Sequence, residues 1–156
     1  MADRNTPKRT TQRPAKSPAT RKTTKVFSED ERGAIRDRAH EMRAGKVDGE
    51  SELRAAIAKM QKPDRALAEQ IDAIVRKSAP TLSPKTWYGM PAYAGNGGLV
   101  CWFQPAQKFK TRYAMIGFSD KAHLDDGAVW PISYALTTLS AADEARVAAL
   151  VKKAVS

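Results

Sequence analysis

Cationic and aromatic side chains gather in one stretch of the sequence, residues 85–118, which holds eight of the eleven aromatic residues. Alternation predicts a strand over residues 108–118 that places Lys108, Lys110 and Arg112 on one face. If the apolar end of this strand enters the core, the cations lie at the rim of an aromatic pocket, where they would bind an anionic group. The candidate residues for binding a ligand or partner are Trp87, Tyr88, Met90, Tyr93, Trp102, Lys108, Lys110 and Arg112.

Two other interpretations fit the same residues. They are compatible with a filled core that has solvated lysines outside it. Aromatic rings beside cations are also typical of platforms on which single-stranded nucleic acid stacks, although the glycine-aromatic signature of an RNA-recognition motif is absent from the sequence. The leading hypothesis is a small binding protein with a ligand or partner site in this stretch.

No residue pattern in the sequence indicates an enzyme. Residues 95–98 are glycine-rich but lack the lysine and Ser/Thr of a phosphate-binding loop, so a hairpin turn is expected there. The two histidines, His40 and His123, are far apart and lack metal-ligand spacing. Cys101 lies among apolar residues, where a thiol is usually buried and inert. The Asp-Asp pair at 125–126 has oxygens that suit a hard cation, but such a pair is more often a turn. We therefore expect no catalytic residues and assign no metal ligand.

The basic residues are concentrated at the N-terminus. The net charge is +10, and residues 1–25 carry eight Lys and Arg side chains against Asp3 alone. This segment has no Leu, Ile, Val or aromatic residue, so it cannot bury enough apolar surface to offset its ordering entropy, and we expect a disordered tail. Its role is either a weak contact with nucleic-acid phosphates or that of a solubilising extension. The residues that would contact phosphates are Arg4, Lys8, Arg9, Arg13, Lys16, Arg21, Lys22 and Lys25.

The sequence also bears on the compartment. It has no apolar run of about 18 residues, so we expect no transmembrane helix. The N-terminus lacks the apolar region of a secretory signal, and a single cysteine rules out an internal disulfide framework. These features predict a cytoplasmic protein.

Capping residues and apolar periodicity predict the helices on either side of the aromatic stretch. Ser28 and Glu31 have the spacing of a capping box, and the helix that follows is so polar that residues 26–49 are expected to be a peripheral extension. Ser140 is expected to cap the last helix. The predicted helices span 29–44, 50–60, 63–78 and 141–155.

The predicted strands belong to one domain over residues 50–156. Gly89 and Pro91 predict a bulge or a sheet edge, and Asn96-Gly97 predicts a hairpin turn. Helices, then antiparallel strands, then a helix is the order typical of an α+β two-layer sandwich, with the sheet packed on helices. The predicted strands span 85–88, 91–94, 98–104, 108–118 and 130–139, with one helical turn at 120–126 capped by Ser119.

Residues 87–93 have the sequence WYGMPAY and are followed later by Lys-Phe-Lys and Gly-Phe. In these residues the sequence resembles the YdhG-like family of small bacterial proteins of unknown function. The likeness covers about residues 51–155. It is closer to actinobacterial members, which share the N-terminal helical extension and the run QKFKTRY at 107–113. The resemblance implies a frataxin-like α+β sandwich, and some members are described as intracellular iron chaperones. Iron is the only cofactor that it implies, and iron delivery would need hard oxygen ligands.

Overall fold

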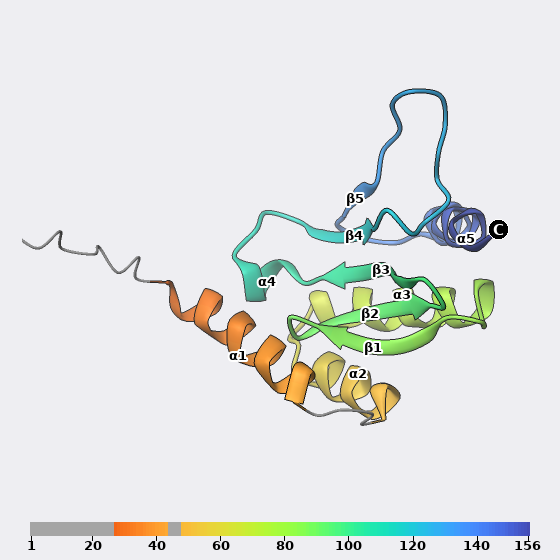
Figure 1. Cartoon of the computed structure of the whole chain (residues 1–156). Helices are drawn as coiled ribbons and strands as arrows, with labels where there is room; N and C mark the ends of the chain where they lie inside the picture. The colour runs from red at the N-terminus through yellow and green to blue at the C-terminus, as the bar shows by residue number, and fades with distance from the viewer. Residues whose placement is uncertain (1–26, 44–47) are drawn as a thin grey trace, which may run out of the picture.

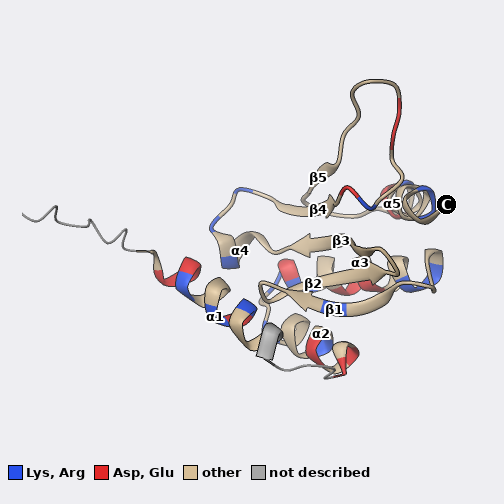
Figure 2. Ribbon diagram, in the orientation of Figure 1, with Lys and Arg blue, Asp and Glu red and all other residues tan. Residues whose placement is uncertain are grey.

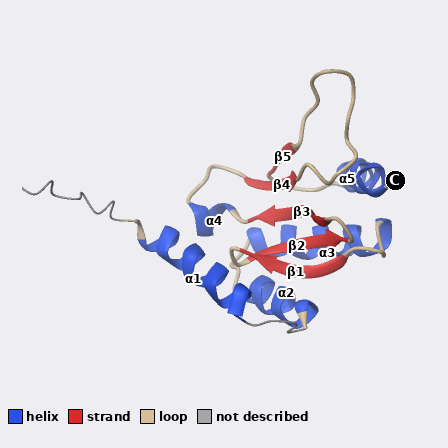
Figure 3. Ribbon diagram, in the orientation of Figure 1, coloured by secondary structure: helices blue, strands red, loops and turns tan. Residues whose placement is uncertain are grey.

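The computed structural model describes residues 27–43 and 48–156, and the predicted tail and most of the turn after the first helix lie outside these residues. The described part has an antiparallel sheet of five strands with helices around it, which confirms the predicted α+β class (Figures 1 and 3). The elements are α1 (Glu29–Arg43), α2 (Gly49–Ala58), α3 (Asp64–Ser78), β1 (Ser83–Trp87), β2 (Met90–Gly95), β3 (Gly98–Gln104), α4 (Ala106–Phe109), β4 (Ala114–Phe118), β5 (Ser133–Leu136) and α5 (Ala141–Val155).

Side-chain caps begin two of the helices as predicted. At the start of α1 the Ser28 hydroxyl accepts from the Glu31 backbone N–H at 3.2 Å, and the Glu31 carboxylate accepts from the Ser28 N–H at 2.8 Å. Ser140 and Asp143 form the same reciprocal pair at the start of α5. Each cap satisfies donors that have no partner inside the helix.

The sheet is a meander in which each strand pairs with the next along the chain. Trp87 faces Met90 across the first hairpin, and the turn between them consists of Tyr88 and Gly89, at φ 53° and 72°. Two consecutive positive φ values define a tight turn whose twist matches the flanking strands. The predicted bulge or edge at Gly89 and Pro91 is therefore wrong, because this segment is a hairpin turn followed by a strand.

The second hairpin turn lies at Asn96-Gly97, as predicted, between β2 and β3. The register of this pair shifts after Tyr93, which faces Cys101, whereas Ala94 faces Leu99. Val100 is consequently the extra residue of a bulge in β3. The irregularity of the sheet thus falls one strand later than the glycine and proline suggested.

Residues 108–118 do not form one strand, which corrects the prediction that aligned three cations. Residues Ala106–Phe109 form the short helix α4, Lys110 follows in the left-handed region at φ 51°, and β4 begins only at Ala114. Two contacts hold this shape. The Asp64 carboxylate accepts from the Gln107 backbone N–H at 2.8 Å, and the Ala106 carbonyl accepts from the Thr111 N–H at 3.0 Å.

The segment between β4 and β5 also differs from its prediction. The expected helical turn at 120–126 is absent, because the Ser119 hydroxyl accepts from the Lys121 N–H at 3.1 Å and closes a turn instead. The connection then projects well beyond the sheet before the chain returns (Figure 1). The last strand lies at an edge of the sheet. It begins at Ser133 rather than at residue 130, after Pro131, which has no N–H to donate to a ladder.

One face of the sheet carries the hydrophobic core. Tyr93, Cys101 and Phe118 face one another across three strands and point toward the helices, and α3 runs behind the sheet in Figure 1. The core joins α2, α3 and α5 to this face and includes the completely buried Leu53, Ile71, Phe103, Ile116 and Val151. Charged residues lie mainly on the helices, whereas the strands are largely apolar (Figure 2).

The opposite face of the sheet bears an aromatic pair. The rings of Trp87 and Trp102 meet edge to face with centroids 5.0 Å apart, and Ala92, which faces Trp102 across the β2–β3 ladder, is completely buried. The Trp102 ring also lies over Gly117 on β4, where an added Cβ atom would come within 2.5 Å of Trp102 Cζ2. Glycine at this position is what lets the indole lie against the sheet.

We expect Gly117→Ala to lower the free energy of unfolding by about 1–3 kcal/mol, because the new methyl group forces the Trp102 ring off the strand. Urea unfolding followed by circular dichroism measures this change. Gly33→Ala on α1 is the control: nothing lies within 4 Å of the added atom, so it should be neutral or slightly stabilising. Equal stability of the Gly117→Ala variant and the unmodified protein would contradict this packing.

Candidate functional site

A cavity of about 540 Å³ lies where α1, α2 and α4 approach the β1–β2 turn. We call it the α1–α2 cavity, and it is defined by Asp37, His40, Glu52, Ala56, Thr86 and Lys108. Its wall mixes apolar atoms with carboxylate, ammonium, hydroxyl and imidazole groups, a composition typical of small-molecule sites. These six residues come from four separate elements, α1, α2, β1 and α4, so only the folded protein brings them together.

Lys108 ties α4 to α1 and to the hairpin turn at one side of this cavity. Its ammonium pairs with the Asp37 carboxylate at 2.5 Å and donates to the Tyr88 carbonyl at 3.0 Å. Gly89 lies directly beside this pair, and a Cβ atom there would overlap both the Lys108 ammonium and the Asp37 carboxylate. Gly89 therefore serves both the left-handed turn and the close approach of the ion pair.

Glu52 lies on the α2 side of the α1–α2 cavity. Its carboxylate accepts from the Thr86 hydroxyl at 3.2 Å and is 3.9 Å from His40 Nε2. The Glu52 side chain is 22% exposed, whereas that of His40 is 78% exposed. This carboxylate thus faces the cavity with no lysine or arginine within ion-pair distance in the described part of the chain.

Asp64 closes the floor between α3 and α4. It is 2% exposed, and its carboxylate accepts from the Gln107 backbone N–H. The Gln107 side-chain amide donates in turn to the Lys62 carbonyl at 3.1 Å. Asp64 is therefore occupied in holding α4 in place.

The eight residues predicted to bind a ligand do not converge. Lys108 lines the α1–α2 cavity, and its ammonium donates to the Tyr88 carbonyl. Trp87, Met90 and Trp102 lie on the face of the sheet opposite the helical core, where Met90 is buried, whereas Tyr93 points into that core.

The three cations also separate from one another. Lys110 pairs with Asp30 at 2.8 Å, and this hydrogen bond raises the pKa of Lys110. Arg112 lies over the Tyr113 ring, with its guanidinium carbon 5.0 Å from the ring centroid. Lys108 pairs with Asp37. The expected row of cations at an aromatic pocket does not form, although a role of any one of these residues in binding stays a prediction.

Sequence reasoning missed the acidic members of the cavity. Asp37 and Glu52 each sit in a helix among other charged residues, and no local pattern distinguishes them from solvated side chains. The one available signal was Asp64, placed at the start of a helix directly after Pro63, which fits a carboxylate that stabilises a helix N-terminus.

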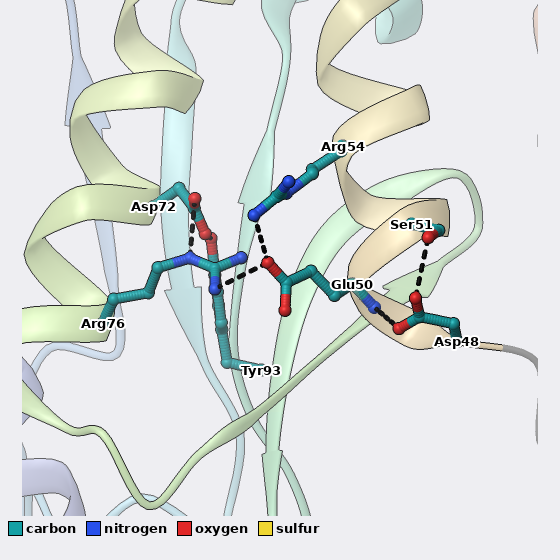
Figure 4. A network of polar contacts seen from close by, with 7 residues as sticks. All are labelled: Asp48, Glu50, Ser51, Arg54, Asp72, Arg76 and Tyr93. Carbon is teal, nitrogen blue, oxygen red and sulfur yellow. Dashed lines mark hydrogen bonds and ion pairs between the residues drawn. The ribbon is translucent and has the colours of Figure 1, made fainter.

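A second polar network lies beneath the sheet, outside this cavity (Figure 4). The Tyr93 hydroxyl donates to Asp72 at 2.8 Å, and Arg76 Nε donates to the other carboxylate oxygen at 2.9 Å. Arg76 also reaches Glu50 at 3.4 Å, which in turn pairs with Arg54. The hydrogen bond to Asp72 raises the pKa of Arg76, and burial raises that of Tyr93. The network links α2 and α3 to the sheet, so its role is structural.

Metal and thiol chemistry have little support in the described residues. They contain no group of three or more His, Cys, Asp or Glu side chains arranged to hold a metal ion. Cys101 is buried, and burial raises the pKa of its thiol to about 12, so it carries no thiolate at neutral pH.

The structure is that of a small α+β protein with one face of its sheet packed on helices. A cavity of mixed polarity lies where α1, α2 and α4 approach the β1–β2 turn. Comparisons with protein-family models, with curated proteins and with solved structures found no match. The YdhG-like resemblance, the frataxin-like fold and the iron-chaperone role stay predictions. Within the described ranges, no helix is both long enough and apolar enough to cross a membrane.

Proposed function

We propose that this protein binds a small organic ligand in the α1–α2 cavity. The observation that carries the proposal is the cavity itself: its volume of about 540 Å³ falls within the range of roughly 300–1,000 Å³ typical of ligand sites. Apolar wall atoms from Ala56, Met60 and Pro105 lie beside polar groups that would fix the orientation of a ligand.

Binding is favoured over catalysis because Asp37, Asp64 and Lys108 of the cavity are held by structural contacts. Asp37 is paired with Lys108, and Asp64 accepts from the backbone of α4. An acid or base in a catalytic step must be free to exchange a proton with the substrate. Among the carboxylates of the cavity, Glu52 has the weakest contacts with other residues of the protein. A single carboxylate of this kind can bind and orient a ligand.

The helix α1 completes the site, which gives the predicted peripheral extension a function. It contributes Asp37 and His40 to the cavity wall. Its packing is slight: Ala34 is buried, but Ile35 is 47% exposed. Polar contacts with α4 and the hairpin turn therefore hold this wall in place.

The proposal predicts that filling the cavity abolishes binding. A library of small organic fragments, titrated against the ¹⁵N-labelled protein, should include members that shift the amide signals of α2, Thr86 and Gly89 in a saturable way. Ala56→Trp places an indole in the cavity and should remove these shifts. Ala58→Trp is the matched control, because Ala58 is exposed on the same helix and does not line the cavity.

Circular dichroism and thermal unfolding of both variants establish that they are folded. Fragments whose shifts scatter over the surface, or binding that survives Ala56→Trp, would contradict a site in this cavity.

A further inference from the structure

Among the residues that the structure describes, no lysine or arginine pairs with the carboxylate of Glu52 in the α1–α2 cavity. Its two polar neighbours are the neutral Thr86 hydroxyl and the exposed His40 ring at 3.9 Å. A partly buried carboxylate gains most from a charged donor, since charge-assisted hydrogen bonds are about twice as strong as neutral ones. An incoming cation therefore finds an available acceptor here.

The lysines of the cavity do not supply that cation. Lys108 is bound to Asp37 and to the Tyr88 carbonyl. Lys59 is exposed, and it forms no ion pair with any residue that the structure describes. Among the described residues, three carboxylates and two ammonium groups line the cavity beside the His40 imidazole, so this part of the wall has one more carboxylate than ammonium group.

An apolar strip leads away from Glu52 along α2. Ala56 is one helical turn further on, and Met60 follows just past the helix; the buried Pro105 also contributes to the lining. At a rise of about 1.5 Å per residue, Glu52 and Ala56 are about 6 Å apart along α2, and Met60 extends the strip beyond the end of the helix. A ligand that fits this surface has one cationic end and an apolar body.

We infer that the ligand is an organic amine, whose ammonium group donates to Glu52 and whose apolar body lies along Ala56, Met60 and Pro105. This inference rests on the proposed function and specifies the chemical class of the ligand. The Thr86 hydroxyl donates to Glu52, so its oxygen remains able to accept a second hydrogen bond from the ammonium. An anionic ligand is disfavoured, because it would approach the Glu52 carboxylate.

Three probes of matched shape test the charge preference: phenethylammonium, 2-phenylethanol and 3-phenylpropanoate. Each is titrated at pH 7 against the ¹⁵N-labelled full chain. We expect phenethylammonium to shift the amides of α2 and Thr86 saturably and to bind more tightly than the other two.

Glu52→Gln should weaken phenethylammonium at least about tenfold, because the amide keeps the shape and the acceptor for Thr86 but loses the charge. Glu69→Gln is the control with the same change in net charge; Glu69 pairs with Arg65 outside the cavity, and this variant should bind like the unmodified protein.

Tighter binding of the alcohol or the carboxylate at the same amides would overturn the amine class and leave the proposed binding function standing. An equal effect of both substitutions would also overturn the assignment to Glu52. If neither these probes nor the fragment library shifts the cavity amides, the proposed function itself fails.

Discussion

Raising the pH from 8 to 11 is expected to lower the free energy of unfolding by about 4 kcal/mol through two buried groups, Cys101 and Tyr93. Burial raises the pKa of the Cys101 thiol from 9.0 to about 12. Burial, with the neighbouring Asp72 carboxylate, raises the pKa of the Tyr93 hydroxyl above its ordinary value of 10.0. Both groups hold their protons more tightly in the folded chain. Above pH 9 the unfolded chain therefore releases protons first, and stability falls as the pH rises.

Urea unfolding at pH 8, 9, 10 and 11 measures the loss. Cys101→Ala should reduce it by about 2–3 kcal/mol and Tyr93→Phe by about 1–2 kcal/mol, because each variant lacks one of the two titrations. Tyr113→Phe, which makes the same substitution at a tyrosine that is 40% exposed, is the control variant. All four proteins contain the same lysines, so the comparison isolates the substituted side chains. Identical slopes for all variants would show that neither buried group holds its proton more tightly in the folded state.

Asp72→Ala is expected to destabilise the protein by about 2–3 kcal/mol, because the Tyr93 hydroxyl then has no acceptor. Tyr93 is only 2% exposed, so water does not replace the lost hydrogen bond. The Arg76 side chain is 38% exposed, and the ion pair itself therefore contributes little. The greater part of the loss comes from the desolvated hydroxyl.

The same helix supplies a matched control. Glu69 pairs with Arg65 at the same spacing on α3, but both side chains are about half exposed. Glu69→Ala should change stability by less than about 0.5 kcal/mol. Adding Tyr93→Phe to the Asp72→Ala variant should cost little more, since both partners are then absent. Equal destabilisation by Asp72→Ala and Glu69→Ala would contradict a special role for the buried hydroxyl.

The sequence predicted the helices well, because their signals are local. The capping box at Ser28 and the cap at Ser140 mark helix starts without reference to the rest of the chain. The turn at Asn96-Gly97 is local in the same way, since the two residues favour the backbone angles that a tight hairpin needs.

The failure at residues 106–113 has a non-local cause. Alternating charged and apolar residues mimic the period of a strand. Asp64, more than forty positions earlier, accepts from the Gln107 N–H and stabilises a turn of helix there. No sequence segment close to Lys108 contains that acceptor, so the alternation of charged and apolar residues wrongly predicted a strand.

The site was harder to predict than the fold. The sequence analysis grouped Tyr93 with Trp87 and Trp102, but these rings lie on opposite faces of the sheet. A tight turn and a bulge determine which face each ring takes. The cavity also depends on Asp37 and Glu52, which line it only when α1 and α2 are packed beside the β1–β2 turn. Composition identified the aromatic stretch but not its distribution over two faces.

The attachment of α1 has a consequence for how long the proposed ligand would stay bound. Lys108–Asp37, Lys110–Asp30 and Arg38 over the Tyr88 ring hold this helix across one side of the cavity. Ions in solution screen such contacts, whereas they leave apolar packing largely intact. Salt would therefore act on the dissociation rate by loosening this wall, so residence time depends on ionic strength even for a ligand whose contacts are mainly apolar.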